Sequence, residues 1–453
     1  MKRREFLGEV AASTTVASTT AVAMAQERSP NEQVRVGWIG CGGRGRFISQ
    51  HLSKVPGVKI TAVCDVYERN RERARTSVGG GCRAYGDFRE LLDQRDIDAV
   101  LVATPDHWHA IPTVMACQAG KDVYVEKPLS HSIHEGRAMV RAARKHSCVV
   151  QTGTQQRSAA HFETAREIIQ SGKLGKVRFV RIWNYRNSFP PRAAVADSDA
   201  PDGLDWDFYL GPAPNVPFNR GRFLGSFRNY FDYSGGIITD YGTHRFDSMR
   251  HITGALAPRT ISASGGLFDL HDGRDIPDVL QITYEFPEFI LSYESCAVNA
   301  HGMGGRTPGR HYYRANNTDD RPNGLALYGS NGALFVDRLG FEIYPELKRN
   351  INIARLGPDR ITRELFRMAP KQEFSPDSTA LHVANFIECV KTRQRPVADV
   401  EIGHRSTSMA LLGNIAYHTG RKLTWNAEQE DFVGDPEASK LLSPAARKPW
   451  DLI

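Results

Sequence analysis

A glycine-rich turn near residue 40 constrains the fold of this chain more than any other feature of its sequence. The turn spans residues 40–45 and reads GCGGRG, which has the pattern GxGxxG. The apolar segment 34–39 before it is typical of a strand, and residues 44–52 can form a helix after it. A second apolar segment, 58–64, ends at Asp65. A GxGxxG turn between a strand and a helix, with an acid about twenty residues further on, is typical of a dinucleotide-binding unit.

The glycines and the acid have separate roles in such a unit. Gly40 allows the tight turn, Gly42 lets the backbone approach the pyrophosphate, and Gly45 lets the helix pack on the strand. Asp65 would accept hydrogen bonds from the adenosine ribose hydroxyls and repel a 2′-phosphate, so we predict NAD rather than NADP. Two arginines close in sequence weaken that preference, Arg69 and Arg71.

The composition is that of a globular protein with room for two domains. The chain has 453 residues, of which 41% are hydrophobic and 24% charged, and its formal net charge is +7. The basic residues are scattered among acids and form no run interleaved with aromatic residues, so no nucleic acid partner is expected. The seven cysteines show no CxxC spacing, which indicates neither a disulfide framework nor a zinc cluster.

The N-terminus is typical of an export leader. Arg3 and Arg4 precede an apolar dipeptide, as in a twin-arginine signal, and the uncharged segment 10–23 follows. That segment is too short and too polar for a stable membrane span, and a small-x-small cleavage site ends at Ala25. We predict a signal peptide over residues 1–25 and a periplasmic or secreted protein. A disordered basic N-terminus is the alternative.

Export constrains how the cofactor is used. The twin-arginine route carries folded proteins, so NAD bound in the cytoplasm would travel out with the chain. Outside the cytoplasm there is no supply to replace it. We therefore expect tightly bound NAD that is regenerated within the site.

The chain divides into two α/β domains with different sheets. Residues 33–153 alternate predicted helices with short, almost wholly apolar strands, which indicates a doubly wound parallel sheet of Rossmann type. Residues 154–425 alternate polar and apolar positions in their strands, which indicates a substrate-binding domain with a large, mainly antiparallel open sheet. Helices at about 379–392 and 403–418 are expected to close this domain, and the tail 426–453 looks irregular.

A lysine stands at the carboxyl edge of the first predicted sheet. Lys127 follows the fifth strand within the tripeptide 126–128, Glu-Lys-Pro, at the edge where open α/β sheets bind ligands. Its amine can hydrogen-bond a substrate hydroxyl, and its charge favours the alkoxide that develops there. Glu126 could orient the nicotinamide side of the cofactor.

A carboxylate and a histidine follow in the second domain. Asp240 and His244 are four residues apart on a predicted helix and therefore share one face. The histidine could remove a hydroxyl proton while the carboxylate orients it and favours the imidazolium. A capping aspartate and a structural histidine would have the same spacing.

These motifs together resemble those of a known family. GxGxxG, TPxxxH at 104–109, Glu-Lys-Pro at 126–128 and GGxxxDxGxH at 235–244 occur in the order seen in the glucose-fructose oxidoreductase and inositol dehydrogenase family, Gfo/Idh/MocA. The resemblance covers roughly residues 34–425, and the leader points to an exported branch. It implies a second domain whose sheet walls the substrate cleft and often forms an oligomer interface, so a homo-oligomer is expected.

The resemblance also assigns roles to residues. It implies that Lys127, Asp240 and His244 are catalytic. The residues expected at the cofactor are Gly40, Gly42, Arg44, Gly45, Asp65, Thr104, Pro105, His107, His109, Glu126 and Lys127.

Two segments depart from the family pattern. The run His107-Trp108-His109 has more aromatic and imidazole side chains than the usual family turn. Trp108 could stack on a sugar or cover the nicotinamide. An HxH pair can bind metal, but no third ligand is assignable, so no metal site is expected. Segment 187–232 is long for a connection, which favours a sugar-binding or oligomer-contact loop. The substrate candidates are Trp108, Arg157, Arg228 and Tyr230.

The sequence leaves three functions open. The leading one is an exported enzyme that moves hydride from a ring carbinol carbon of a sugar or glycoside to retained NAD, with glycoside cleavage as a redox-neutral outcome, as in the NAD-dependent α-N-acetylgalactosaminidases it resembles. The second is a dehydrogenase, or an oxidoreductase that oxidises one sugar and reduces another. The third is a non-catalytic nucleotide-binding sensor, against which the intact Lys127, Asp240 and His244 argue.

Overall fold

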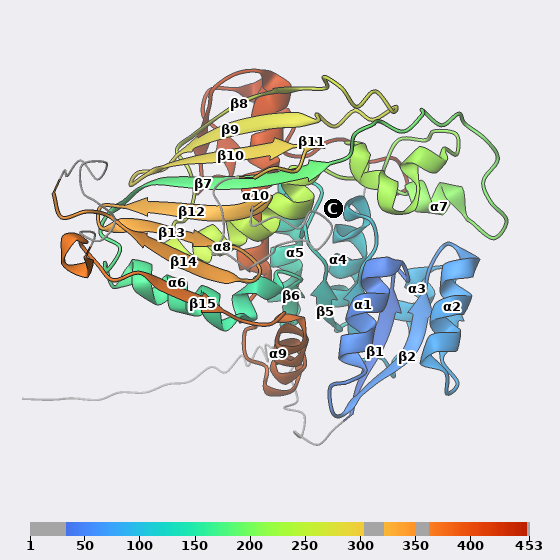
Figure 1. Cartoon of the computed structure of the whole chain (residues 1–453). Coiled ribbons are helices and arrows are strands. Elements are labelled where there is room, and N and C mark those ends of the chain that lie inside the picture. The colour runs from blue at the N-terminus through green and yellow to red at the C-terminus, as the bar shows by residue number, and fades with distance from the viewer. Residues whose placement is uncertain (1–32, 303–320, 350–361, 451–453) are drawn as a thin grey trace, which may run out of the picture.

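Two sheets of different construction organise the chain (Figure 1). The structure is a computed structural model that describes residues 33–302, 321–349 and 362–450. The first sheet is wholly parallel and the second is mixed and mainly antiparallel, so the predicted fold class is confirmed. The predicted signal peptide, residues 1–25, lies outside the described residues and stays a prediction. Within the described ranges, no helix is long and apolar enough to cross a membrane.

The first sheet has the strand order β3-β2-β1-β4-β5-β6. Its strands are β1 (Val34–Ile39), β2 (Val58–Cys64), β3 (Arg83–Tyr85), β4 (Ala99–Val102), β5 (Asp122–Val125) and β6 (Val150–Thr152). The helices between them are α1 (Gly43–Leu52), α2 (Glu68–Val78), α3 (Phe88–Leu92), α4 (Ala110–Gln118) and α5 (Ile133–Lys145). The order reverses between β1 and β4, and ligands of open α/β sheets bind at such a switch point.

The second sheet has eleven strands in the order β15-β14-β13-β12-β7-β10-β9-β8-β16-β17, with β11 paired to β7. Neighbouring strands are antiparallel except for β7 and β10. The strands are β7 (Val177–Asn187), β8 (Thr260–Gly266), β9 (Val279–Glu285), β10 (Ile290–Cys296), β11 (Val298–Asn299), β12 (Asn323–Gly329), β13 (Gly332–Val336), β14 (Gly340–Pro345), β15 (Lys371–Phe374), β16 (Leu423–Asn426) and β17 (Asp431–Phe432).

Three helices cover one face of this sheet and form the main core with it. They are α6 (Ala160–Gln170), α8 (Thr243–Thr253) and α10 (Val400–Thr419). Figure 1 shows α8 and α10 behind the strands, and α6 along the lower edge of the sheet. Because α10 also contacts α5, it is packed by both domains and fixes one against the other.

Helix α9 (Thr379–Thr392) lies with the first domain, which corrects the expectation that it closes the second. It packs beside α1, and Phe386 meets the ring of Tyr124 from β5 edge-on at 5.7 Å. Val383 and Phe386 share a buried cluster with Trp38 of β1. The amphipathic pattern of the segment predicted a helix correctly, but it carried no information on which sheet the helix covers.

Residues 426–450 of the tail are ordered, which corrects the expectation of an irregular end. Strand β17 pairs with β16, and the short helix α11 (Pro436–Lys440) follows it. Phe432 and Leu442 are buried in the main core, and Trp450 is buried against Trp108 of the first domain. These elements are too short to show a period, so only their partners elsewhere in the chain reveal them.

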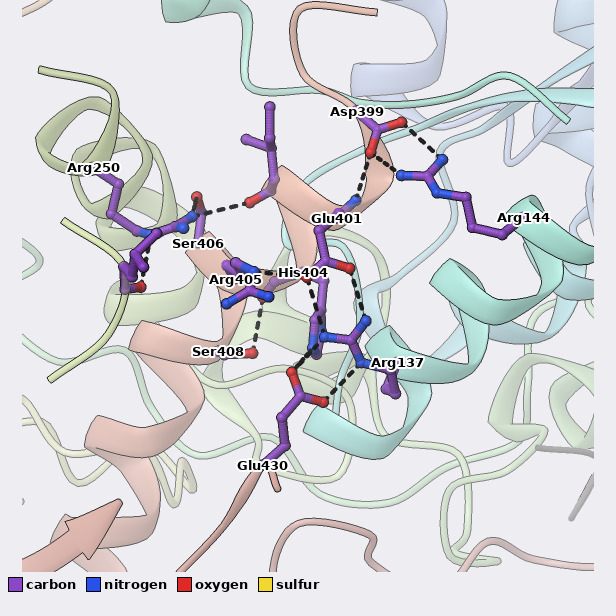
Figure 2. A network of polar contacts seen from close by, with 12 residues as sticks. Arg137, Arg144, Arg250, Asp399, Glu401, His404, Arg405, Ser406, Ser408 and Glu430 are labelled. Carbon is purple, nitrogen blue, oxygen red and sulfur yellow. Dashed lines mark hydrogen bonds and ion pairs between the residues drawn. The ribbon is translucent and has the colours of Figure 1, made fainter. Parts of the chain in front are cut away.

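Ion pairs also join the two domains (Figure 2). Arg137 of α5 pairs with Glu401 of α10 at 2.7 Å and with Glu430 at 2.5 Å. Arg144, also on α5, pairs with Asp399, the residue that caps α10. Because both arginines are partly buried in this contact, the pairs fix the angle between α5 and α10. The space between the domains therefore has a defined shape.

Candidate active site

A pocket of about 530 Å³ lies where the carboxyl edge of the first sheet meets the second domain. Most of the residues predicted for the cofactor and for catalysis share its wall. They are Gly40, Gly42, Arg44, Asp65, Thr104, Pro105, His109, Glu126, Lys127, Asp240 and His244. Trp108 and Arg228, two of the substrate candidates, also contribute to the wall.

The glycine turn has the geometry that a bound pyrophosphate requires. Gly40 has a φ of +86°, and a Cβ on it would lie 2.6 Å from the backbone of Ala103. A Cβ on Gly45 would lie 2.2 Å from the carbonyl oxygen of Gly40, so only glycine lets α1 approach β1 this closely. Gly42 caps α1 with open space around its Cβ position and no side-chain cap. The first N–H groups of α1 are therefore free to bind an anion, and the turn fits NAD.

Asp65 stands at the end of the pocket where the adenosine ribose would lie. Its carboxylate accepts hydrogen bonds from the backbone N–H of Cys41 at 2.7 Å and of Tyr67 at 2.9 Å. Burial raises the pKa of Asp65 to about 6, against the effect of those hydrogen bonds. Arg71 donates to the Asp65 carbonyl oxygen and, like Arg69, is absent from the wall of this pocket. The residue that faces the ribose is therefore the acid.

Lys127, Asp240 and Arg228 form a charged cluster at the other end. Lys127 Nζ donates to the carbonyl oxygen of Asp240 at 2.9 Å and forms a short bond to its carboxylate Oδ1. Arg228 Nε lies 3.2 Å from the same oxygen. Burial alone would raise the pKa of Asp240, but the two cations outweigh it and hold that pKa well below its usual range. Asp240 is therefore ionised, and it fixes the position of Lys127.

His244 does not pair with Asp240, which corrects the predicted carboxylate–histidine pair. Residues Ile238–Gly242 form a single π-helical turn, and α8 begins directly after it. Two cations already hold the Asp240 carboxylate, and they bind it more strongly than a neutral imidazole would. His244 is 3% exposed, and its Nδ1 has no hydrogen-bond partner among the described residues.

The charge state of His244 also differs from the prediction. Burial, followed by the nearby Arg338 and Lys127, lowers the pKa of His244 well below its ordinary value. The imidazole is therefore neutral at physiological pH. A neutral imidazole in the pocket wall can accept a proton, but it does so as a weak base.

Glu126 is engaged by groups on both sides of the pocket floor. Its Oε1 pairs with Arg44 Nε at 2.8 Å, and its Oε2 accepts a bond from the Lys127 backbone N–H at 3.2 Å. The pair connects the start of α1 to the end of β5. Glu126 thus holds the two segments that would contact the cofactor at a fixed separation.

The His-Trp-His run is mostly structural. His107 is absent from the pocket wall; its Nε2 bonds the Tyr209 carbonyl oxygen at 3.1 Å, and burial lowers its pKa to about 3. Trp108 donates to the same carbonyl at 2.9 Å and packs against Trp450 and Phe208. Its ring is held by other aromatic rings and still contributes to the pocket wall, so its predicted contact with the sugar or the nicotinamide stays a prediction.

The third member of that run has a different place. His109 lines the pocket and contacts the carbonyl oxygens of Thr104 and Pro128. Its ring nitrogens therefore already have partners. In the part of the chain that the structure describes, no group of histidines, cysteines and carboxylates could hold a metal ion.

Two substrate candidates lie outside the pocket, which corrects those assignments. Arg157 bonds the buried Asp247 at 2.8 Å and His251 at 3.1 Å, and it faces a separate hollow beside α6 and α8. Tyr230 packs in the core of the inserted loop, with the guanidinium of Arg222 4.3 Å from its ring centroid. Arg228, two residues before it, does line the pocket.

Several pocket residues were not found from the sequence. Arg338, in the turn between β13 and β14, lines the wall, and its guanidinium lies 5.9 Å from the ring centroid of Tyr241. A single arginine in a turn carries no motif. Phe223 and Leu224 also line the wall, and they belong to the long segment 187–232 that its length had marked as functional.

Known proteins resemble this chain over both domains. Residues 34–154 match the NAD-binding Rossmann-fold domain of the Gfo/Idh/MocA oxidoreductase family, and residues 159–264 and 363–452 match its C-terminal alpha/beta domain. The myo-inositol 2-dehydrogenase of Thermotoga maritima is 23% identical over 403 residues, which cover 88% of this chain and 100% of that protein.

Two further comparisons give one partial likeness and one likeness in fold. Glycosyl hydrolase family 109 protein 2 of Shewanella sp. (strain ANA-3) is 39% identical over 112 residues, which cover 23% of this chain and 25% of that protein. The structure of an aldose-aldose oxidoreductase from Caulobacter crescentus, complexed with glycerol, superposes with a TM-score of 0.61 at 18% identity, over 87% of this chain and 100% of that one. The second likeness shows a shared fold. The chain therefore belongs to the Gfo/Idh/MocA family of NAD-binding oxidoreductases, the family that its motifs indicate.

Proposed function

We propose that the protein is an exported oxidoreductase that keeps NAD bound and oxidises a carbinol carbon of a sugar or glycoside. One observation carries the proposal: the glycine turn and Asp65 share a continuous pocket with Lys127 and His244. The test is to add a panel of sugars and glycosides to the purified protein and to follow the near-ultraviolet absorbance of reduced nicotinamide. A protein that holds NAD but reduces it with no member of the panel would contradict the proposal.

Different residues of the first domain suit different parts of the cofactor. The open N-terminus of α1 at Gly42 suits the pyrophosphate, and Asp65 suits the ribose hydroxyls. Thr104 and Pro105, at the end of β4, face the same space. When bound there, NAD supplies the acceptor for the hydride that leaves the carbinol carbon.

Lys127 assists at the substrate oxygen. Its ammonium is held by Asp240, so it points to a fixed place in the wall. A substrate hydroxyl beside it would gain a hydrogen bond, and the negative charge that develops on that oxygen would be stabilised. Asp240 acts on the substrate through Lys127, as a positioning residue.

His244 is the group that takes the proton. As the carbon–oxygen double bond forms, the hydroxyl proton moves to the neutral imidazole while the hydride leaves the same carbon. The low pKa of His244 keeps the accepting form present throughout the physiological range. The weak basicity of the imidazole is offset in part by Lys127, because a charged lysine makes the bound hydroxyl more acidic.

Export and retention of the cofactor rest on the sequence of the leader. Fusing residues 1–30 to a folded reporter should send it to the periplasm, and changing Arg3 and Arg4 to lysine should keep it in the cytoplasm. Denatured protein from the periplasm should release NAD. Export that continues with both lysines, or protein that releases no nicotinamide nucleotide, would contradict this part of the proposal.

Glycoside cleavage without net oxidation is the second candidate. It is favoured by the match to a family 109 glycosyl hydrolase and by the predicted loss of access to the cytoplasmic NAD pool. The ketone formed in the first step acidifies the neighbouring C–H bond, so the glycosidic oxygen could leave by elimination. Water would then add, and reversal of the oxidation would restore the sugar.

Product analysis separates these outcomes. Released aglycone without accumulation of reduced nicotinamide indicates cleavage. A ketosugar with reduced nicotinamide indicates a dehydrogenase. One oxidised and one reduced sugar, formed in equal amounts, indicate a sugar–sugar oxidoreductase, the activity that the name of the Caulobacter crescentus structure states for that protein.

We also propose that the protein is a homo-oligomer through its second sheet. A row of rings in mutual contact crosses four neighbouring strands of that sheet, namely Phe179, Tyr328, Phe335 and Tyr344. Phe179 is 37% exposed and Tyr344 is 45% exposed, although both are large and apolar. Phe179→Asp should lower the mass measured by light scattering to that of a monomer. A wild-type mass of one chain would contradict the proposal.

A further inference from the structure

Positive charge gathers at the end of the pocket where the substrate would lie. Lys127, Arg228 and Arg338 line this end, and Arg186 of β7 is close enough to affect the pKa of Asp240. Three carboxylates face these four cations, Asp240, Asp106 and Glu126, and Glu126 is already paired with Arg44. The cations therefore outnumber the carboxylates among the residues that the structure describes.

The carboxylates have little capacity left for the cations. Asp240 is shared between Lys127 and Arg228. Asp106 accepts a hydrogen bond from Ser234 at 2.6 Å. Neither acid forms an ion pair with Arg186 or with Arg338 in the described part of the chain.

Two of the arginines have no ionic partner within the described part of the chain. Arg186 is partly buried, and its Nε has no hydrogen-bond partner among residues 33–302, 321–349 and 362–450. Arg338 is exposed at the pocket wall and contacts the face of Tyr241 rather than a carboxylate. Because burying a cation without a counterion is costly, the partly buried Arg186 is more easily kept where a ligand supplies the anion, and the exposed Arg338 can meet a ligand directly from the pocket wall.

The cofactor end differs in this respect. Arg44 has its own carboxylate in Glu126, and the Asp65 carboxylate is held by two backbone N–H groups. The charged groups at the cofactor end thus already have partners within the protein. The excess at the other end is not needed to hold the glycine turn or the ribose, so it points to the second ligand.

We infer that the substrate carries an anionic group, a carboxylate or a sulfate or phosphate ester, which Arg338 and Arg228 hold beside the carbinol carbon. The inference rests on the proposed function, since it places this group on the sugar that the same pocket would oxidise. A guanidinium offers two parallel N–H groups, which match the paired oxygens of each of these anions. Arg338 comes from the second sheet and Arg228 from the inserted loop, so the anion would be gripped from two elements.

The test is a binding titration of the full mature protein loaded with NAD. Calorimetry would compare D-glucose with D-glucuronate, glucose 6-sulfate and glucose 6-phosphate, and D-galactose with its matching derivatives. Each anionic sugar differs from its parent at carbon 6 alone. We expect at least one to bind about tenfold or more tightly than its neutral parent, as for one charge-assisted contact, and we expect added salt to reduce the difference.

Variants assign the preference to its residue. Arg338→Gln should lower the affinity for the preferred anionic sugar about tenfold and leave the neutral parent unchanged, and Arg338→Lys should retain part of the affinity. Arg338 is exposed, so its loss should not unfold the chain. Arg259→Gln is the matched control, since Arg259 is an exposed arginine of the same domain outside this pocket. It should bind as the wild type does.

The outcomes separate the inference from the proposed function. The inference is overturned if neutral sugars bind as tightly as anionic ones, if no anionic sugar binds, or if Arg338→Gln keeps the preference. If the preference depends on Arg338 but no sugar reduces the bound NAD, the substrate class stands and the oxidation fails. If neutral sugars alone reduce NAD, the oxidation stands and the substrate class fails.

Discussion

The two ends of the active-site pocket are built in different ways. The cofactor end comes from short stretches of the first sheet: the turn at Gly40 and Gly42 follows β1, and Asp65 follows β2. Each of these residues is positioned by its own backbone or by neighbours in the same domain. Asp65, for example, is held by the N–H groups of Cys41 and Tyr67.

The substrate end is assembled from distant parts of the chain. Lys127 meets Asp240, which is 113 residues further along the chain, and Arg338 enters from a turn of the second sheet. Its charges are shared among residues that no single motif contains. The difference teaches that the cofactor end is a property of a local pattern, while the substrate end is a property of how the two domains pack. The predictions below test whether the two ends are as independent as this comparison indicates.

The largest effect is expected from Lys127→Met. It removes the ammonium that would stabilise charge on the substrate oxygen, so turnover should fall by a factor on the order of 10² or more. NAD should stay bound, because the glycine turn and Asp65 are untouched. Turnover with the best substrate of the panel and NAD released on denaturation are the two measurements. Lys173→Met, at an exposed lysine of the second domain, is the control and should change neither. Loss of NAD from Lys127→Met would break the comparison, since the two ends would then be coupled.

His244→Ala should also lower turnover on the order of 10²-fold, as expected for the loss of a positioned base. The pH dependence gives a second measurement. The neutral imidazole is the active form, and its pKa lies well below the ordinary value of about 6.5. Activity of the wild type should therefore stay constant as the pH falls through 6.5 and decline only at lower pH, and the variant should lose this acidic limb. Added imidazole should restore part of the activity. Normal turnover with an unchanged pH profile would make His244 a structural residue.

Sequence reasoning succeeded where the structure is local. The turn 40–45, the strand before it and the acid after it specify the first half of the Rossmann sheet through residue types at fixed spacing. The same reasoning placed Lys127 at the end of β5, because each strand of a parallel sheet is short and apolar. The fold class and the family followed from these patterns and are confirmed.

It failed where a contact joins distant segments. The pairing of Asp240 with Lys127 and Arg228 rather than with His244 depends on how the inserted loop and β5 meet. Trp450 packs on Trp108 across more than 300 residues of chain, so neither residue reveals the other in the sequence. The amphipathic period of a helix says which of its faces is buried, but it does not name the partner.

A smaller effect is expected from Asp65→Asn at the cofactor end. The change removes the negative charge that would repel a 2′-phosphate while it keeps the size of the side chain. The ratio of the NADP to the NAD dissociation constant should fall about tenfold, as for the loss of one charge–charge contact. Titration of nucleotide-free protein with each cofactor measures the ratio. The preference between anionic and neutral sugars should stay as in the wild type. A change in that preference would show that the two ends share their electrostatics.

The smallest effect concerns His107, which was predicted to bind the cofactor and lies outside the pocket wall. Burial lowers its pKa to about 3, while in the unfolded chain it is about 6.5. As the pH falls below 6.5, the unfolded chain takes up this proton and the folded protein does not. Stability is therefore lost toward pH 3, by at most about 1.4 kcal/mol per pH unit. His107→Gln can still donate to the Tyr209 carbonyl and should reduce this slope in urea unfolding, with NAD retained. His271→Gln, at an exposed histidine, should keep the wild-type slope. Loss of NAD from His107→Gln, with an unchanged slope, would show that His107 binds the cofactor after all.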